Sequence, residues 1–163
     1  MSETSHIPFR EVPYLPQKSK IEHRDDGTIL LDNGQPLKDH PPHMLWPLKY
    51  WAEHAPDRIW LAQRDPITPS REGWQEISYA EGWQRVQALA KGFLNAGADA
   101  PLMILSRNTI DHAVIMYGAM LAGIAVVPVT PAYALLSQDF ARLNYVDDLV
   151  EPKFIYVEDG AEY

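Results

Sequence analysis

The stretch LAGIAVVPVTPAY, residues 121–133, overlaps an apolar, uncharged segment of seventeen residues from Ala113 to Val129. A run of this length is at the lower limit for crossing a bilayer. Two glycines and Pro128 interrupt it, however, and division at Gly123 leaves a helix followed by a short valine-rich strand. Strands of this kind are typical of buried parallel sheets. We therefore interpret the stretch as a helix end, a tight turn at Gly123 and a central strand, and not as a membrane span.

The residues on both sides of this stretch alternate between strand and helix patterns. From Leu102 onward the order is strand, helix, strand, helix and strand, at LMILS (102–106), Asn108 to about Leu121, AVVPV (125–129), Ser137 to Val150 and KFIYV (153–157). This β-α-β-α-β order predicts parallel strands joined by right-handed crossovers. Doubly wound sheets usually contain more than three strands. The fold class is therefore α/β, with an incomplete doubly wound parallel sheet.

Capping residues and apolar spacing locate the helices. Ser78 and Glu81 stand three apart, as in a capping box, at the start of a helix that Gly97 is placed to end. Asn108, with Asp111 three residues later, is expected to cap the helix after the first parallel strand. One apolar face of the last helix is predicted at Phe140, Leu143, Val146 and Val150.

The first part of the chain has a different character. Residues 1–42 are rich in proline and show little periodicity, which indicates an extended arm on the surface. Within this arm, Asp26-Gly27 between two apolar runs predicts a small hairpin over residues 21–31. We therefore divide the chain into an arm, residues 1–42, and a second region, residues 43–163.

The second region begins with a short helix and a further hairpin. Pro47 suits the first turn of a helix, where a missing N–H costs nothing, and Leu48 and Trp51 share its apolar face. The segments IWLAQ (59–63) and GWQEIS (73–78) are predicted to pair as two strands around a polar loop.

Charge and composition exclude several classes of function. Lys and Arg number 14 against 22 Asp and Glu, so the net charge is -8, and the acidic residues are scattered along the chain. We expect no nucleic-acid partner, because phosphate backbones bind clustered cations. The absence of cysteine excludes disulfides and thiol catalysis. The N-terminus MSETSHIPFR has no secretory pattern, and we expect a cytoplasmic protein without a membrane partner.

Several residue sets could bind a phosphate or a metal ion, but each has a structural explanation. The pairs Gly92/Gly97 and Gly118/Gly123 have the glycine spacing of a P-loop, yet neither is followed by Lys-Ser/Thr, and close helix packing explains them more simply. The two histidines of HPPH, His40 and His43, are too few to make a metal site without further ligands. We therefore predict no metal site.

Other sets could carry catalysis or ligand stacking. Ser106, Asp111 and His112 are the residue types of a hydrolase triad, but no G-x-S-x-G elbow holds the serine. We interpret Asp111 as stabilising a helix N-terminus and His112 as a surface or packing residue. No catalytic residue is predicted. The tryptophans at positions 46, 51, 60, 74 and 83 are attributed mainly to core packing.

One further group lies where open α/β sheets place ligands. Thr130, Pro131 and Tyr133 follow the carboxyl end of a predicted parallel strand. We interpret them as a loop turn, and the cofactor-binding residues stay unknown.

Two segments resemble conserved segments of one enzyme family. ISYAEGWQRVQALAKGFLNAG resembles the first conserved segment of the adenylate-forming (AMP-binding) superfamily, and LAGIAVVPVTPAY is similar to the second. MILSRNTIDHAVIMYGAM is similar to the helix that lies between them. The flanking segments PLKYWAEHAPDRIWLAQRD and SQDFARLNYVDDLVEPKFIYVEDG most resemble bacterial feruloyl-CoA synthetases. The resemblance covers nearly the whole chain and is strongest from about residue 43 to residue 160.

The resemblance implies an N-terminal fragment of an ATP-dependent acid-CoA ligase. Residues 43–163 would be the N-terminal portion of a truncated acyl-CoA synthetase-like large domain. Enzymes of this family join a carboxylic acid, here a hydroxycinnamic-type acid, to AMP and then transfer it to coenzyme A, with ATP, Mg²⁺ and coenzyme A as cofactors. Their phosphate loop and catalytic lysine belong to later segments. The implied partners are therefore the remainder of the adenylating domain and a C-terminal domain, and the fragment alone is expected to be inactive and to bind none of these cofactors well.

Two alternatives belong to other classes. The chain could be a self-sufficient, non-enzymatic α/β module that binds a partner or a small acid. Exposed apolar surface opposes this, since burial contributes about 25 cal/mol per Å² and net domain stability is only about 5 to 15 kcal/mol. A flavodoxin-like enzyme or receiver domain ranks last, because no acidic cluster follows LMILS or AVVPV.

Overall fold

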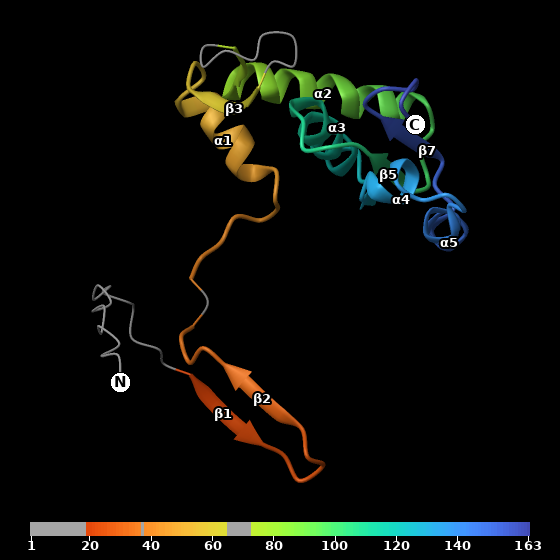
Figure 1. Ribbon diagram of the computed structural model, residues 1–163. Helices are drawn as coiled ribbons and strands as arrows, with labels where there is room; N and C mark the ends of the chain where they lie inside the picture. The colour runs from red at the N-terminus through yellow and green to blue at the C-terminus, as the bar shows by residue number, and fades with distance from the viewer. Residues whose placement is uncertain (1–18, 37, 65–72) are drawn as a thin grey trace, which may run out of the picture. The chain divides into compact units, whose positions relative to one another are not determined.

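The computed structural model describes residues 19–36, 38–64 and 73–163. The chain divides into two units, Met1–His40 and Pro41–Tyr163. In the described part of the first unit, β1 (Lys20–His23) and β2 (Ile29–Asp32) form an antiparallel hairpin whose side chains are all exposed (Figure 1). Gly27 has φ +83° in its turn, a conformation that glycine adopts without strain. This confirms the predicted hairpin, whereas the proline-rich residues before Ser19 lie outside the described residues.

The second unit begins with the predicted helix and hairpin. Helix α1 spans Trp46–His54 and has proline in its first turn. Strands β3 (Ile59–Arg64) and β4 (Trp74–Ser78) pair antiparallel. The loop predicted between these strands lies outside the described residues.

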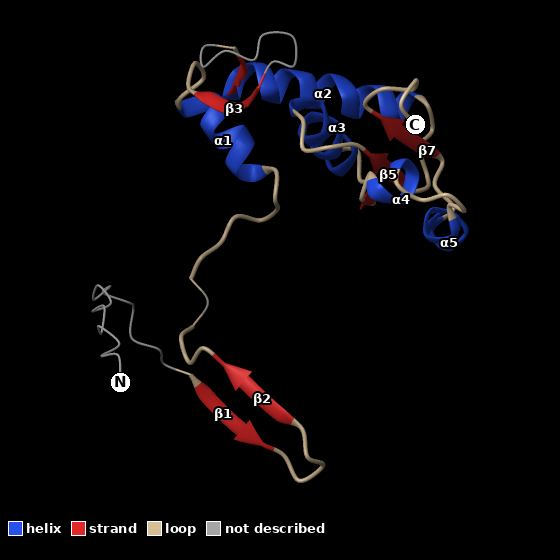
Figure 2. Cartoon of the chain, in the orientation of Figure 1, coloured by secondary structure: helices blue, strands red, loops and turns tan. Residues whose placement is uncertain are grey.

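Helix α2 (Tyr79–Asn95) follows β4 directly, and Ser78 caps it. The Ser78 hydroxyl accepts a hydrogen bond of 3.2 Å from the backbone N–H of Glu81, as the capping box predicts. The last turn ends at Gly97, which has φ +63°. Helix α3 (Ile110–Leu121) packs along α2, and Figure 2 shows the two helices next to each other.

A three-stranded parallel sheet occupies the C-terminal half of the unit. Its strands β5 (Leu102–Leu105), β6 (Val126–Val129) and β7 (Phe154–Val157) lie in the order β6-β5-β7. The prediction that the valine-rich strand is central is therefore wrong for this chain. The central strand is β5, because the chain crosses back after β6 and places β7 on the free side of β5. All four residues of β5 are buried.

The cap of helix α3 (Ile110–Leu121) lies one residue later than predicted. The cap is Thr109, whose hydroxyl accepts a 3.0 Å hydrogen bond from the N–H of His112, and not Asn108. Both residues are good caps by type, so the sequence pattern alone does not distinguish them.

The predicted helix over residues 137–150 is wrong in its first turn. The structure has a short helix α4 (Ala132–Leu135), then a turn, and α5 (Ala141–Val150). The Ser137 hydroxyl accepts a bond from the N–H of Phe140, and the Asp139 carboxylate accepts one from the N–H of Ala141. Such local bonds compete with helix formation. Phe140 has φ +53° and is exposed, so it does not belong to the apolar face predicted for this helix.

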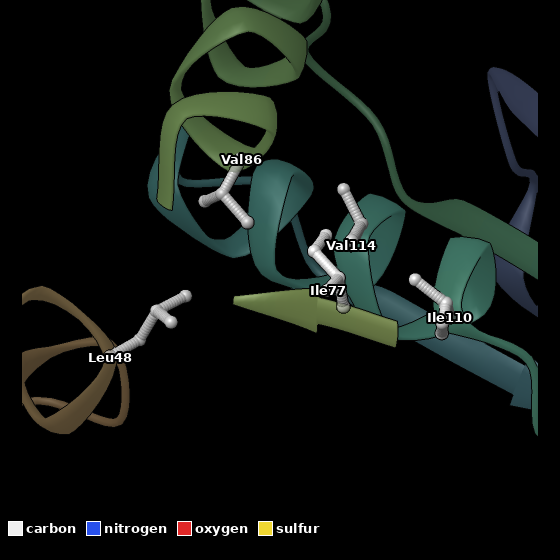
Figure 3. Packing of buried hydrophobic residues seen from close by; sticks show 5 residues of the cluster. All are labelled: Leu48, Ile77, Val86, Ile110 and Val114. Carbon is white, nitrogen blue, oxygen red and sulfur yellow. The ribbon is translucent and has the colours of Figure 1, made fainter. Parts of the chain in front are cut away.

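Three apolar clusters hold the second unit together. The first joins α1, β4, α2 and α3 through five buried side chains (Figure 3), namely Leu48, Ile77, Val86, Ile110 and Val114. The second lies between the sheet and the helices α2 and α3, and contains Leu102 and Ile104. The third lies on the opposite face of the sheet, where Met103 and Leu105 pack against Leu143 and Val146 of α5.

Helices therefore contact both faces of the parallel sheet, while completion of a doubly wound sheet stays a prediction. Among the described residues, no helix is long and apolar enough to span a membrane.

Candidate functional site

The strand order places a topological switch point between β5 and β7. The connection after β5 leads to β6 on one side, and the connection after β6 returns to β7 on the other side. Open α/β sheets bind ligands at the carboxyl ends of the strands at such a point. An open cleft with a volume of about 630 Å³ lies there, and its lining includes Arg107, Asn108, Tyr156, Glu158 and Glu162. This cleft is the candidate functional site.

An ion cluster closes the carboxyl end of the sheet. The Arg107 guanidinium donates from Nη1 to Glu158 Oε1 at 2.7 Å and to Glu162 Oε2 at 2.8 Å, and it also contacts Glu162 through Nη2. Hydrogen bonds and charge from Glu162, and then from Glu158, raise the pKa of Arg107 above its ordinary value. The same hydrogen bond from Arg107 lowers the pKa of Glu162. The cluster ties the loop after β5 to the turn after β7.

Both described arginines in the cleft already have partners. Arg107 is held between two carboxylates, and the Arg64 guanidinium lies 4.4 Å from the centre of the Trp74 ring. The Arg107 cluster carries one positive charge and two negative charges. An anionic ligand such as a phosphate would have to displace a carboxylate there, so Arg107 does not form a ready-made phosphate site.

Next to this cluster, Ser106 and His112 are hydrogen-bonded. The Ser106 Oγ lies 2.7 Å from His112 Nδ1 and also donates to the carbonyl of Arg107 at 3.1 Å. A hydroxyl has one hydrogen to donate, so the assignment that fits both contacts has Nδ1–H donating to Oγ. Ser106 is buried, with 4% exposed surface.

In the described part of the chain, Asp111, the third residue of the possible hydrolase triad, does not hydrogen-bond to His112 and pairs with another residue. The Asp111 carboxylate pairs with Arg85 Nη2 at 2.6 Å and lies in the first turn of α3, as expected for a residue that stabilises a helix N-terminus. The structure thus brings together Ser106 and His112, and Asp111 has another partner. His112 is half-buried, and its ring contacts the buried Ser106 hydroxyl, a contact that the sequence alone did not predict.

Thr130, Pro131 and Tyr133 form the predicted turn. The Thr130 carbonyl accepts from the N–H of Tyr133 at 3.1 Å, and Pro131 precedes the short helix α4. The Arg142 guanidinium lies 5.7 Å from the centre of the Tyr133 ring, at the side of a hollow of about 330 Å³. These three residues lie after β6, not at the β5–β7 switch point.

The glycine pairs have different explanations. At Gly118 a Cβ atom would lie 2.7 Å from the Leu89 Cβ, so the close approach of α2 and α3 requires glycine. At Gly92 a Cβ would meet no atom within 4 Å, so packing is the wrong explanation for that residue. Gly97 and Gly123 have positive φ at helix ends.

The tryptophans are less buried than predicted. Trp60 and Trp83 pack against the first apolar cluster, whereas Trp46, Trp51 and Trp74 are exposed. Core packing therefore accounts for two of the five.

The histidines of HPPH do not gather further metal ligands among the described residues. His40 and His43 are both exposed. In the parts of the chain that the structure describes, no group of three His, Cys, Asp or Glu side chains could hold a metal ion.

A parallel α/β sheet with helices on both faces and a cleft at its switch point defines a class of small-ligand-binding and nucleotide-binding domains. Residues 48–162 match the family model of the AMP-binding enzymes. The chain therefore belongs to the AMP-binding enzyme family, as its sequence segments indicated. No match was found among curated proteins.

Solved structures with a similar fold are adenylate-forming ligases and related proteins. A fatty acid AMP ligase from Legionella pneumophila has a TM-score of 0.56 at 16% identity, over 66% of this chain and 18% of that one. VinN in complex with L-aspartate has a TM-score of 0.56 at 20% identity, over 71% and 29%. CmiS6 has a TM-score of 0.58 at 17% identity, over 77% and 30%. The chain thus spans less than a third of the length of these structures, and the likeness shows the fold.

Proposed function

We propose that this chain is the N-terminal part of an ATP-dependent, AMP-forming acid-CoA ligase that activates a hydroxycinnamic-type acid. In this proposal the complete enzyme forms an acyl-adenylate with release of pyrophosphate and then transfers the acyl group to coenzyme A. The observation that carries the ligase assignment is the family match over residues 48–162. The choice of acid depends on the resemblance of the flanking segments to feruloyl-CoA synthetases, and is the finer part of the proposal.

The described residues supply the scaffold of such an enzyme. Adenylation needs cations that stabilise the charge developing on the phosphates. Arg107 is already paired with two carboxylates. The described residues contain no group of three His, Cys, Asp or Glu side chains that could hold a metal ion. They do not form a fitting site for ATP and Mg²⁺. We therefore assign no step of the reaction to residues of this chain and expect those groups in the rest of the domain.

Ser106 and His112 have a structural role in this proposal. A serine acts as a nucleophile when a base accepts its proton and a third group orients that base. Here the hydroxyl donates to the Arg107 carbonyl, and the carboxylate nearest in sequence, Asp111, is paired with Arg85. The pair fixes the loop after β5.

The test is ATP–pyrophosphate exchange with two proteins and two acids. The 163-residue chain, supplied with ATP, Mg²⁺ and ferulate, should show no exchange above a protein-free control. A longer product of the same gene, reading through a Ser/Thr/Gly-rich loop, should show exchange that depends on ferulate, and it should form feruloyl-CoA when coenzyme A is added.

Two results would count against the proposal in different ways. Exchange by the longer product with a saturated fatty acid, and not with ferulate, would disprove the choice of acid and leave the ligase class intact. Ferulate-dependent exchange by the 163-residue chain alone would disprove the assignment of the catalytic groups to later segments.

A further inference from the structure

A small pocket lies between β3 and the first half of α3. It has a volume of about 300 Å³, at the lower end of the range for ligand pockets. Its lining comes from β3, from the turn that precedes α3, and from α3 itself. No residue of the edge strands β6 and β7 contributes to it, so its walls do not depend on how the sheet continues at either edge.

The walls of this pocket are mainly apolar. Leu61 of β3 and Ala113 and Met116 of α3 supply half-buried apolar surface. None of the described residues that line the pocket is Asp, Glu, Lys or Arg. Burial of a charged group without a partner is costly. The pocket therefore favours an uncharged ligand, although the chain as a whole has a net charge of -8.

One ring nitrogen of His112, which lines the pocket, is an available hydrogen-bond acceptor. The Ser106 hydroxyl donates its single hydrogen to the Arg107 carbonyl, so Nδ1–H of His112 donates to the Ser106 Oγ. A neutral imidazole carries one N–H, which leaves Nε2 without a hydrogen. Among the described residues, no donor bonds to Nε2. It can therefore accept a hydrogen bond from a ligand.

Two other polar side chains of the pocket already have partners. The Gln63 Oε1 accepts from the N–H of Ile110 at 2.6 Å, which joins β3 to the start of α3. The Thr109 hydroxyl accepts from the N–H of His112 at 3.0 Å. Asn108 is exposed, so water can satisfy its amide. The contacts of Gln63 and Thr109 hold the walls in place and leave the His112 ring as the main polar feature of an apolar pocket.

We propose that this pocket binds a small uncharged molecule with an apolar body and a hydroxyl group, an alcohol or a phenol, whose O–H donates to His112 Nε2. The small volume favours a ligand with a single ring. A ligand that cannot donate would leave the acceptor unpaired among apolar walls, and this loss makes the site selective for the hydroxyl group. The site assigns no residue a role in adenylation and is independent of the proposed ligase activity.

The test is titration of the 163-residue chain with phenol, anisole and benzoate, followed by amide NMR shifts. Phenol donates a hydrogen bond, anisole has a methyl group in place of that hydrogen, and benzoate carries a charge. Phenol should shift the amides of Ala113 and Met116 and bind about three- to tenfold more tightly than anisole. Benzoate should not bind. Absence of these shifts with phenol, or benzoate binding as tight as phenol binding, would overturn the proposal.

Two variants locate the site and its acceptor. The amide nitrogen of asparagine is one bond beyond Cγ, as Nδ1 is, so His112→Asn can keep the bond to Ser106 while it removes Nε2. It should bind phenol about three- to tenfold more weakly and anisole as before. Ala113→Leu fills the pocket and should abolish binding of both, and circular dichroism checks that both variants are folded. Equal losses for phenol and anisole in His112→Asn, or phenol binding that survives Ala113→Leu, would contradict the assignment.

Two further measurements need no variant. At alkaline pH, where the ring is neutral, the side-chain ¹⁵N spectrum of His112 should show a protonated Nδ1 and an unprotonated Nε2 whose signal moves with phenol. The opposite tautomer would remove the acceptor and disprove the proposal. The longer product of the same gene should bind phenol as tightly as the 163-residue chain does. Loss of binding there would mean that another segment occupies the pocket, which also disproves it and leaves the ATP–pyrophosphate exchange test unaffected.

Discussion

Gly118→Ala should push α2 and α3 apart. The added Cβ would lie 2.7 Å from the Leu89 Cβ and 3.4 Å from the Val86 carbonyl oxygen. The Leu89 Cβ is attached directly to the backbone, so a change of rotamer cannot move it away. Relief of the contact requires a shift of one helix against the other. Val86 and Val114, which belong to the same helix pair, are almost completely buried, and the shift would disturb their packing.

The expected cost follows from two opposing effects. Overpacking a well-packed core costs about 1 to 3 kcal/mol. Alanine in place of glycine within a helix stabilises by about 1 kcal/mol. Since the clash involves a backbone-attached atom, the upper part of the first range applies, and the net loss for Gly118→Ala should be about 1 to 2 kcal/mol. Gly92→Ala, on α2, meets no atom within 4 Å and should stabilise by about 1 kcal/mol.

Urea denaturation of the two variants and the unmodified chain, followed by circular dichroism, measures both effects. The two variants carry the same chemical change in neighbouring helices, so their difference isolates the contact with Leu89. It should be about 2 to 3 kcal/mol from the sum of the two estimates. A Gly118→Ala variant as stable as Gly92→Ala would refute the claim that this glycine is required for helix contact.

Two further changes test the ion cluster and the helix cap. Arg107 lowers the pKa of Glu162, so the Glu162 carboxylate stabilises the fold at pH values above its ordinary pKa and loses that contribution as the pH falls through the lowered pKa. Glu162→Gln should therefore reduce the loss of stability on acidification below about pH 4. Thermal melts across a range of pH measure this difference. Ser78→Ala removes the acceptor for the N–H of Glu81 and should destabilise the chain by about 1 kcal/mol in the same urea assay. Ser78→Asp keeps an acceptor at this position and should not destabilise the chain. Equal losses of stability in both variants would contradict the capping role.

Much of the fold follows from local sequence patterns. The Asp26-Gly27 turn, the Ser78 cap and the three parallel strands appear where turn chemistry, capping and apolar runs predict them. These features depend on residues close together in the chain. The order of strands in the sheet does not, and for that reason β6 was predicted as central from its apolar character. A valine-rich strand is expected at the centre of a sheet, yet here β5 is buried more completely.

The errors at helix ends have a different origin. Asn108 and Thr109 are both suitable caps by residue type. We attribute the choice of Thr109 to the position at which β5 ends and to a contact between Gln63 and the first residue of α3. The Gln63 Oε1 accepts from the N–H of Ile110 at 2.6 Å. That contact joins residues far apart in sequence, so no local pattern contains it. At Phe140, side-chain bonds from Ser137 and Asp139 stop a helix that apolar spacing alone favours.

The contacts at the carboxyl edge of the sheet were also hidden from the sequence. Arg107 meets Glu158 and Glu162 only because β7 lies beside β5, and Ser106 meets His112 across the turn into α3. Residue type and spacing suggested a possible triad and could not show that Asp111 is paired with Arg85. The signal that could have pointed to the Ser106–His112 contact is the serine directly after a buried strand, where an unpaired hydroxyl would be costly.

The same contacts explain why we expect the family's chemistry to depend on residues outside this chain. The segments that identify the family are those that build the sheet and its covering helices, and their side chains are occupied with each other. Arg107 is paired with both Glu158 and Glu162, so its positive charge is already matched by carboxylates of the protein before any ligand arrives. Catalysis of adenylation needs cations oriented toward a ligand. The cleft arginine, Arg107, is directed toward carboxylates of the protein and not toward a ligand. We therefore expect the cations that adenylation needs to come from the rest of the domain, with this chain as their scaffold.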